Sequence, residues 1–548
     1  MILVYEFEYV SNNSVLENFL QNFASEKKIE YYITKKRCKI SLHARGDEEI
    51  LISFSDELSK SLPFSIFLKS TLVKVSDEWN EDKADVAQEC EIYLPFTKKA
   101  INAAKDEYNP FVKNEIGKNP DIYPPLIFTY NGESIEYESN FKDAFLKAAD
   151  VIASGEKLNL KTLSGTFCIS KIKKDTPYKD DTTVMLSDLS FADKIAVIKN
   201  EEIAVLASLE KPTVKVHTNL IFSSEYTNFP RFIKLKLASD LFLYFLSLAL
   251  FEKGVKFVVL DDEYDTPNAS LYFKQQIENI ARFEVCPLKN GQNIIIKGTS
   301  FTTPKLLKSI KVLKNRHHMQ FAATMQELAL FEETNCGVYL SLNNDDMIML
   351  YNDKEGVLDF VQIDFENSLE QILENIEKTD DNGKKLIEKY RQTFPQFYKN
   401  AKNISLESKN ISTLWGAAAY LLGFGDSLYH AQKELLKNIE IFGGQKGVRV
   451  DYKLLDKNNI KTSLNAGKFL QSVISFKLAG TDDMILSFGI AESLVYFLSD
   501  FADKMKDEFE VKNILLMGSL FGSKTISNLC VKHLGANLRF NKELPIEL

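Results

Sequence analysis

The sequence predicts a multidomain protein of mixed α/β and α+β class, and three observations lead to that prediction. The chain has 548 residues, which is enough for about three or four domains of ordinary size. Hydrophobic residues make up 45% and charged residues 26%, as in globular proteins with sizeable cores. Short β-rich runs alternate with apolar residues at helical spacing, which indicates sheets covered by helices.

The charge balance and the apolar runs argue against several classes of protein. The formal net charge of -9 disfavours nucleic acid as a partner. The longest apolar run, residues 235–251, is interrupted by Lys236, Ser239 and Asp240, so we expect no transmembrane segment. Residues 1–10 alternate like a strand and lack the pattern of a signal peptide, which predicts a cytoplasmic protein.

The cysteines predict neither a disulfide framework nor a zinc finger. None of them belongs to a CxxC pair, and their scattered positions are typical of buried thiols. The six are Cys38, Cys90, Cys168, Cys286, Cys336 and Cys530.

Residues 1–80 predict a small open sheet with two helices on one face. The expected strands are residues 2–9, 29–33, 39–44, 50–53 and 64–75, and the expected helices are residues 15–24 and 56–62. Residues 81–138 follow as a connecting segment punctuated by Asn-Pro and Pro-Pro pairs.

Residues 139–300 predict a second domain. An amphipathic helix at 141–154 ends at Gly155 and leads to a strand at 157–160 and a turn that contains Gly165. The later strand that ends at 260–263 carries three acids, Asp261, Asp262 and Glu263, which disfavour phosphate binding there.

Residues 301–548 predict a larger, two-lobed α/β domain. We expect a helix at 316–327, strands at 337–342 and 512–517, and a last helix that ends at 534. The second strand leads directly into a turn whose backbone N–H groups form a generic phosphate site. Gly518, Ser519, Gly522 and Ser523 are therefore the candidate phosphate loop.

The helix at 316–327 begins with two histidines. Two histidines at i and i+4 can hold one metal ion, but the residue four positions after His317 is Phe321. From the residues alone, His317 and His318 are interpreted as a polar helix start. Glu327, at the other end, is interpreted as a solvated helix residue.

This helix and the strand that follows it resemble the entrance to the transferase domain of the HypF-type carbamoyltransferases. These proteins make the cyanide ligands of nickel–iron hydrogenases, and the chain looks like the divergent HydE-type accessory proteins among them. The resemblance implies an acylphosphatase-like domain at 1–80, a linker at 81–138 that replaces a zinc module, a YrdC-like domain at 139–300 and an actin/hexokinase-like, carbamoyltransferase-like domain at 301–548. It also implies a helix at 193–206 and a strand at 210–216 in the YrdC-like domain, and helices at 410–423 and 484–505 in the last domain.

The family's chemical motifs are largely replaced. Phe321 stands where the family has its second metal-ligating His, and Ser341 stands where a strand carries Asp, so His317 would be a vestige of a metal site. The loop at 11–18 has no Gly, and Glu17 replaces the phosphate-binding Arg of the family. A carboxylate there repels phosphate, which predicts that the first domain has no acylphosphatase activity.

These observations favour an accessory or maturation protein of [NiFe]-hydrogenase, a scaffold whose catalytic centres have decayed. The expected partner is a hydrogenase subunit or another maturation protein, and no cofactor is expected. One alternative is an active, divergent carbamoyltransferase that moves a carbamoyl group from an adenylate to a partner thiol and requires ATP and Mg²⁺. A second alternative is a small-molecule-binding protein that reuses the cleft between the lobes.

Overall fold

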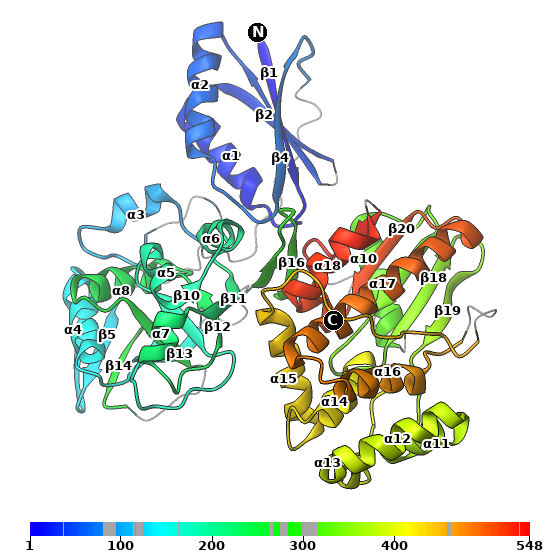
Figure 1. The fold of residues 1–548 in the computed structure, drawn as a ribbon. Helices are drawn as coiled ribbons and strands as arrows, with labels where there is room; N and C mark the ends of the chain where they lie inside the picture. Colours follow the sequence, from blue (N-terminus) through cyan, green and yellow to red (C-terminus); the bar gives the residue numbers. More distant parts are fainter. Residues whose placement is uncertain are drawn as a thin grey trace. The chain divides into compact units, whose positions relative to one another are not determined.

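The computed structural model describes the whole chain except residues 37, 81–94, 113–115, 117–123, 163–164, 262–266, 274–282, 299–312, 314, 457–461 and 536. Predictions at 163–164, at 262–263, at Cys90 and across much of 81–138 therefore lie outside the described residues. The chain forms two units (Figure 1): Met1–Pro287 with Lys297–Thr302, and Leu288–Ile296 with Thr303–Leu548. The predicted boundary at residue 300 falls close to this division, and the predicted boundaries at 80 and 138 lie inside the first unit.

The first unit begins with a four-stranded antiparallel sheet of order β2-β3-β1-β4. Its elements are β1 (Ile2–Tyr9), α1 (Val15–Glu26), β2 (Glu30–Lys36), β3 (Lys39–Arg45), α2 (Glu48–Ser61) and β4 (Leu68–Ser76). This is the βαββαβ order of ferredoxin-like folds. Figure 1 shows both helices on one face of the sheet, as predicted.

The predicted strand at 50–53 is wrong, because these residues lie inside α2. Glu48 and Glu49 occupy the first turn of the helix, where acidic side chains interact favourably with the helix dipole. The buried residues Leu51, Phe54 and Leu58 then follow at helical spacing, so the apolar run belongs to a helix face.

A larger sheet fills the rest of the first unit, with strand order β15-β11-β12-β9-β13-β8-β7-β14-β5-β6 and β10 against β11. Its strands are β5 (Leu126–Tyr130), β6 (Glu133–Tyr137), β7 (Leu158–Thr162), β8 (Gly165–Lys171), β9 (Thr183–Leu186), β10 (Ala196–Val197), β11 (Thr213–Thr218), β12 (Phe232–Lys236), β13 (Phe257–Asp261), β14 (Ala269–Phe273) and β15 (Glu284–Pro287). Its helices are α3 (Lys98–Ala104), α4 (Lys142–Ala153), α5 (Ala192–Ile195), α6 (Asn200–Ala207), α7 (Leu220–Glu225) and α8 (Leu241–Glu252). The apolar α4 and α8 pack on each other in its core.

The predicted helix at 193–206 is interrupted. Ala196 and Val197 leave the helix to pair with Thr218 and His217 of β11, so the region becomes α5, β10 and α6. The backbone pairing with a neighbouring strand outweighs the local helical pattern here. The helix at 141–154 is confirmed as α4, and Gly155 follows it with a φ of +92°.

The second unit contains a five-stranded sheet of order β19-β18-β17-β20-β21, in which β17, β20 and β21 are parallel. Its strands are β17 (Asn335–Tyr339), β18 (Met347–Asn352), β19 (Gly356–Gln362), β20 (Asn513–Met517) and β21 (Leu538–Arg539), and β16 (Asn293–Lys297) precedes them. Its helices are α10 (Arg316–Leu328), α11 (Leu369–Thr379), α12 (Asp381–Thr393), α13 (Pro395–Ala401), α14 (Ile411–Leu422), α15 (Leu428–Ile441), α16 (Ala466–Leu478), α17 (Asp483–Phe509) and α18 (Lys524–Leu534). A short 3-10 turn, η3 (Ser519–Gly522), joins β20 to α18.

Among the described residues, α17 alone is long and apolar enough to cross a membrane by length and composition. However, 67% of its apolar window is buried inside the protein. The helix packs against α15 and α18, which is the environment of a core helix.

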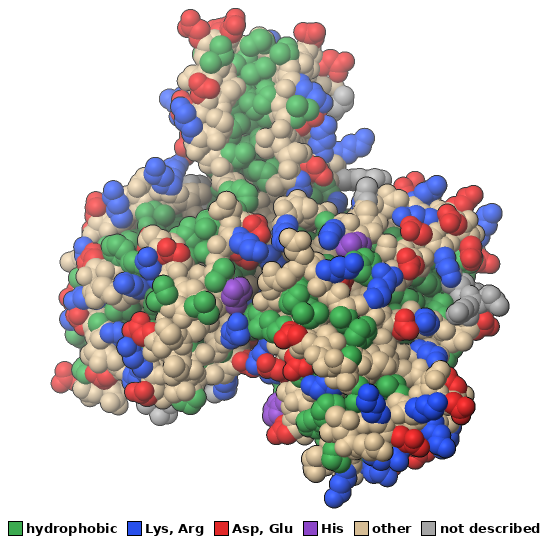
Figure 2. All heavy atoms as spheres, viewed as in Figure 1, with side chains coloured by type: hydrophobic (Ala, Val, Ile, Leu, Met, Phe, Trp, Pro, Cys, Tyr) green, Lys and Arg blue, Asp and Glu red, His purple; other side chains and the backbone are tan. Residues whose placement is uncertain are grey.

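The surface carries charges of both signs. On the face drawn in Figure 2, acidic and basic side chains are interspersed over both units. Several form ion pairs, such as Lys215 with Asp181 and Lys174 with Glu225, both at 2.9 Å. The absence of a nucleic-acid partner stays a prediction from this charge balance.

Candidate functional site

Two loops meet at the carboxyl edge of the sheet in the second unit. Strands β17 and β20 are parallel neighbours, so the loops that follow them emerge at the same edge, where open α/β sheets bind ligands. The backbone N–H of Leu340 donates to the carbonyl of Met517 at 2.9 Å, and that of Leu520 donates to the carbonyl of Leu340 at 3.1 Å. The predicted phosphate loop thus lies directly against the loop that contains Ser341.

Gly518 is required by this close approach of two backbones. Its φ is +98°, and a Cβ atom added there would lie 2.1 Å from the carbonyl oxygen of Leu340. Gly522 is less constrained, because a Cβ atom there would meet only the side chain of Ile296, at 3.2 Å. Gly518 therefore shapes the turn, whereas Gly522 tolerates a larger side chain more easily.

The backbone N–H of Ser519, the best placed phosphate donor of the turn, is bound to a carboxylate of the chain itself. It donates to Oε2 of Glu547 at 2.7 Å. The other oxygen, Oε1, accepts hydrogen bonds from the hydroxyls of Tyr339 and Ser341, both at 2.8 Å, and from the side-chain amide of Asn344. Burial raises the pKa of Glu547, but these hydrogen bonds outweigh burial and lower it below its usual value. The site therefore holds an anion.

Ser341 organises the loop around that carboxylate. Its hydroxyl oxygen accepts from the backbone N–H groups of Asn343 and Asn344 at 3.1 and 3.0 Å, while its own N–H donates to Asp346 at 2.7 Å. The second carboxylate oxygen of the buried Asp346 accepts from the N–H of Ile411 at 2.6 Å. Burial raises the pKa of Asp346 well above its usual range. These contacts fix the loop and leave Ser341 fully buried.

The N-terminus of α18 also faces a carboxylate. Ser523 is the N-cap residue, and its hydroxyl donates to Oε1 of Glu440 on α15. The hydroxyl of Thr525 donates to Oε2 of the same residue at 2.8 Å. Two of the four predicted loop residues, Ser519 and Ser523, are thus bound to acidic side chains of the protein.

The segment that carries Glu547 is held by α10. The carboxylate of Glu327 accepts the backbone N–H groups of Lys542, Glu543 and Leu544 at 2.9, 2.5 and 2.8 Å. The side chain of Gln320 donates to the carbonyl of Pro545 at 3.0 Å and accepts from the N–H of Leu548 at 2.7 Å. The interpretation of Glu327 as a solvated residue is therefore wrong. Its partners lie more than two hundred residues away, so no local signal could have revealed them.

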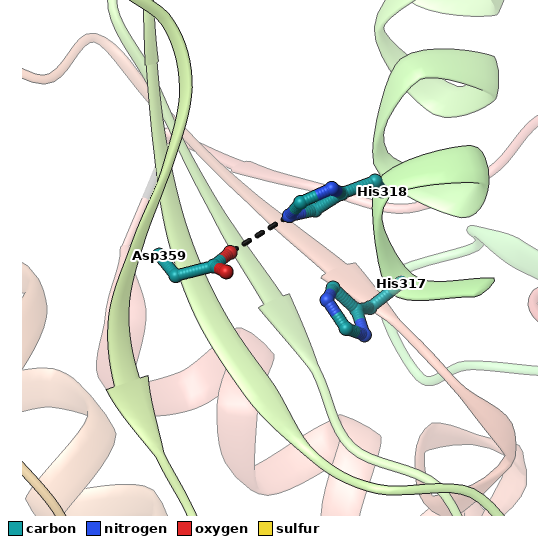
Figure 3. A group of neighbouring side chains, drawn as sticks. All are labelled: His317, His318 and Asp359. Carbon is teal, nitrogen blue, oxygen red and sulfur yellow. Dashed lines mark hydrogen bonds and ion pairs between the residues drawn. The ribbon is translucent and has the colours of Figure 1, made fainter. Parts of the chain in front are cut away.

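His317 lies in a group that the sequence did not predict. Figure 3 shows His317 and His318 on the first turn of α10, facing Asp359 on β19. Nε2 of His318 lies 2.7 Å from Oδ1 of Asp359, and one potential ligand atom from each of the three residues lies within 4.8 Å of the others. Burial lowers the pKa of His317, which favours the neutral imidazole.

A β-bulge directs Asp359 toward α10. Ile348 of β18 pairs with Val361 of β19, but the next residue, Met349, pairs with Asp359, so Phe360 is the extra residue. Bulges of this kind re-aim side chains locally. Phe321, in contrast, is fully buried in the core, as expected for a residue that cannot bind a metal ion.

Side chains of the loop at 11–18 of the first unit accept two of the loop's own backbone N–H groups. The hydroxyl oxygen of Ser11 accepts from the N–H of Asn13 at 3.0 Å. Oδ1 of Asn13 accepts from the hydroxyl of Tyr9 at 2.7 Å and from the N–H of Val15 at 3.2 Å. Glu17 is buried and pairs with Lys35 at 2.8 Å.

Comparisons with known proteins include a curated relative and solved structures that cover the whole chain. No family model matches the sequence. The chain is 24% identical over 522 residues to Protein HydE of Wolinella succinogenes, covering 92% of this chain and 91% of that protein. A solved structure of full-length HypF in the phosphate- and nucleotide-bound form covers 100% of this chain and 96% of its own, with a TM-score of 0.64 and 12% identity. HypF of T. kodakarensis covers 100% of this chain and 97% of its own, with a TM-score of 0.68 and 13% identity.

Both structural likenesses extend over the whole chain and concern the fold. They confirm the predicted fold class, and together with the relative they confirm the predicted resemblance to the HypF-type family.

Proposed function

Because the chain is a divergent relative of HydE with the fold of HypF, we propose that it serves hydrogenase maturation as a binding or assembly protein without carbamoyltransferase activity. The relation to HydE covers nearly the whole length of both proteins, which supports a role for the whole chain. The role in maturation follows from the family resemblance of the sequence.

The observation that carries the loss of catalysis is the carboxylate of Glu547 on the N–H of Ser519. A nucleotide phosphate at this turn needs the same N–H group. It would have to displace a carboxylate that four donors already hold. If the carboxylate stayed, the two anions would repel each other.

The surroundings of the turn add to that repulsion. The carboxylate of Glu440 binds the hydroxyl of Ser523 at the start of α18, the end of a helix at which a phosphate would otherwise bind. The metal-binding positions of the family are occupied by Phe321 and Ser341, which cannot neutralise a polyphosphate. These features support a protein that binds neither ATP nor carbamoyl phosphate at this edge.

The proposed partner is a hydrogenase subunit or another hydrogenase maturation protein, and the proposed location is the cytoplasm. Affinity-tagged full-length chain, co-expressed with the hydrogenase subunits and maturation proteins of its source, should retain one of them through purification. Copurification should persist in the Glu547→Ala variant if binding does not depend on the turn. Failure to retain any of them would contradict the assembly role.

Calorimetric titration tests the loss of nucleotide binding. Wild-type protein is titrated with ATP, with and without Mg²⁺, and then with carbamoyl phosphate present. We expect no binding in the micromolar range. Micromolar binding that disappears in Gly522→Leu would overturn the proposal in favour of an active carbamoyltransferase. Gly522 is the better probe than Gly518, because Gly518 is needed for the turn itself.

A further inference from the structure

We propose that His317, His318 and Asp359 bind a divalent transition-metal ion such as Zn²⁺, Co²⁺ or Ni²⁺. This ligand set differs from the one that the family resemblance implies, which combines two histidines at i and i+4 with an Asp on the following strand. In this chain the first His is kept as His317, but the second His position holds Phe321, which is buried in the core, and the Asp position holds Ser341, which is bound to Glu547. Phe321 and Ser341 do not fit a metal ion.

Two of the three donor groups are already in contact. Nε2 of His318 and Oδ1 of Asp359 are 2.7 Å apart, and ligand atoms of all three residues lie within 4.8 Å of one another. Ligand atoms on a tetrahedral zinc ion are roughly 3.3 Å apart, given bonds of about 2.0–2.2 Å. The three donors therefore lie close to this spacing, and a bound ion would replace the direct contact between His318 and Asp359.

The third donor has an unused nitrogen. Nε2 of His317 is buried and makes no hydrogen bond to any residue that the structure describes. Buried polar atoms are nearly always paired, so a buried nitrogen without a partner needs an explanation. In Figure 3 the ring of His317 lies beside His318, on the side that faces Asp359. A metal ion bound between the three side chains would satisfy this nitrogen.

The site is anchored on rigid elements but accessible. Both histidines lie on the first turn of α10, and the β-bulge fixes the direction of Asp359. The side chain of Asp359 is 46% exposed and that of His318 is 23% exposed, so an ion can reach the site from solvent. Three protein ligands would leave a coordination position open to water or to a ligand from a partner.

The donor set selects the class of metal. Two imidazole nitrogens and one carboxylate oxygen suit Zn²⁺, Co²⁺ and Ni²⁺, whereas Mg²⁺ and Ca²⁺ prefer oxygen ligands alone. The inference depends on these three residues and not on the proposed role in hydrogenase maturation.

Metal titration of the full-length protein tests the proposal. The protein is first treated with a chelator and then titrated with Co²⁺, followed by visible absorption, and with Zn²⁺, followed by calorimetry; Mg²⁺ serves as the negative probe. The variants are His318→Ala and Asp359→Asn, both at partly exposed positions. The matched control is His430→Ala, because Nδ1 of His430 also lies 2.7 Å from an Asp, Asp426, but this pair belongs to no three-residue group among the described residues.

We expect one Co²⁺ ion per chain with micromolar or tighter affinity, and no binding of Mg²⁺. Affinity should fall at least about tenfold in His318→Ala and in Asp359→Asn and stay unchanged in His430→Ala. Circular dichroism of each variant should match the wild type. Absence of Co²⁺ and Zn²⁺ binding, or binding that both site variants retain, would overturn the proposal.

Discussion

The loop at 11–18 in the first unit and the turn at 518–523 in the second unit lie where the HypF-type resemblance places phosphate sites, and in each of them backbone N–H groups are bound in a different way. In the first loop, neutral side chains two residues away accept the N–H groups of Asn13 and Val15. In the second, the charged Glu547 binds the N–H of Ser519 from a separate segment. The acceptors in the first loop are neighbouring residues of the same loop. The acceptor in the second turn comes from a distant segment, which reaches the turn only when the unit is folded.

The difference has a physical consequence. Ser11 and Asn13, which accept N–H groups of the first loop, are themselves residues of that loop. A carboxylate on another segment can be removed by one substitution without changing the turn. The turn at 518–523 therefore keeps the backbone of an anion site that is occupied from within, whereas in the loop at 11–18 the N–H groups of Asn13 and Val15 are held by side chains of the loop itself.

The largest expected effect concerns the backbone of the turn. In Gly518→Ala the new Cβ would meet the carbonyl oxygen of Leu340, so we expect the second unit to lose about 3 kcal/mol or more of unfolding free energy. Trp415, buried in α14, reports this unfolding by fluorescence in a Trp79→Phe background. The matched control is Gly535→Ala, which has a φ of +80° but no atom within 4 Å of its Cβ, and should cost about 1 kcal/mol. Equal losses in both variants would contradict the close approach.

The next effect concerns the support of the Glu547 segment. Glu327→Ala leaves three backbone N–H groups without their acceptor. We therefore expect the free energy of unfolding, measured with urea, to fall by about 2–3 kcal/mol. The exposed Glu332→Ala should change the free energy of unfolding by less than about 0.5 kcal/mol. Similar values for both would mean that Glu327 does not hold the segment.

A smaller effect concerns Ser341. Ser341→Asp restores the acid of the family but places a second carboxylate beside Oε1 of Glu547. We expect the free energy of unfolding to fall by about 1–3 kcal/mol, and we expect the additional substitution Glu547→Gln to restore most of it. Ser341→Ala, which adds no charge, should not be rescued by Glu547→Gln. Additive effects of Ser341→Asp and Glu547→Gln in a double-mutant cycle would refute the contact.

The sequence predicts a structural feature better when the residues that interact are close together along the chain. The helices α4 and α10 and the strand β20 follow from hydrophobic periodicity, which is local, whereas α14 and α17 are predicted from the family resemblance. The prediction that the first domain has no phosphate loop also rests on neighbouring residues, because Glu17 and the missing glycines are visible there. The contacts of Glu547 with Ser341 and of Glu327 with Lys542 span about two hundred residues and are set by the tertiary fold. A β-bulge directs Asp359 toward His318, and this bulge leaves no clear mark in the sequence.

The smallest expected effect is a null result in the first unit. Glu17→Arg restores the basic residue of the family, but the N–H groups of Asn13 and Val15 remain bound to neighbouring side chains. We expect neither the wild-type chain nor this variant to release phosphate from carbamoyl phosphate or another acyl phosphate. Enzymatic release by either would show that the loop still binds an acyl phosphate.

The most direct test of the account is amide hydrogen exchange at Ser519 and Leu520 in the wild type and in Glu547→Ala. The N–H of Ser519 is bound to Glu547, whereas that of Leu520 is bound to the carbonyl of Leu340. The account predicts that exchange at Ser519 becomes much faster in the variant while exchange at Leu520 stays slow. Equal exchange at Ser519 in both proteins would contradict the claim that Glu547 occupies the anion site of the turn.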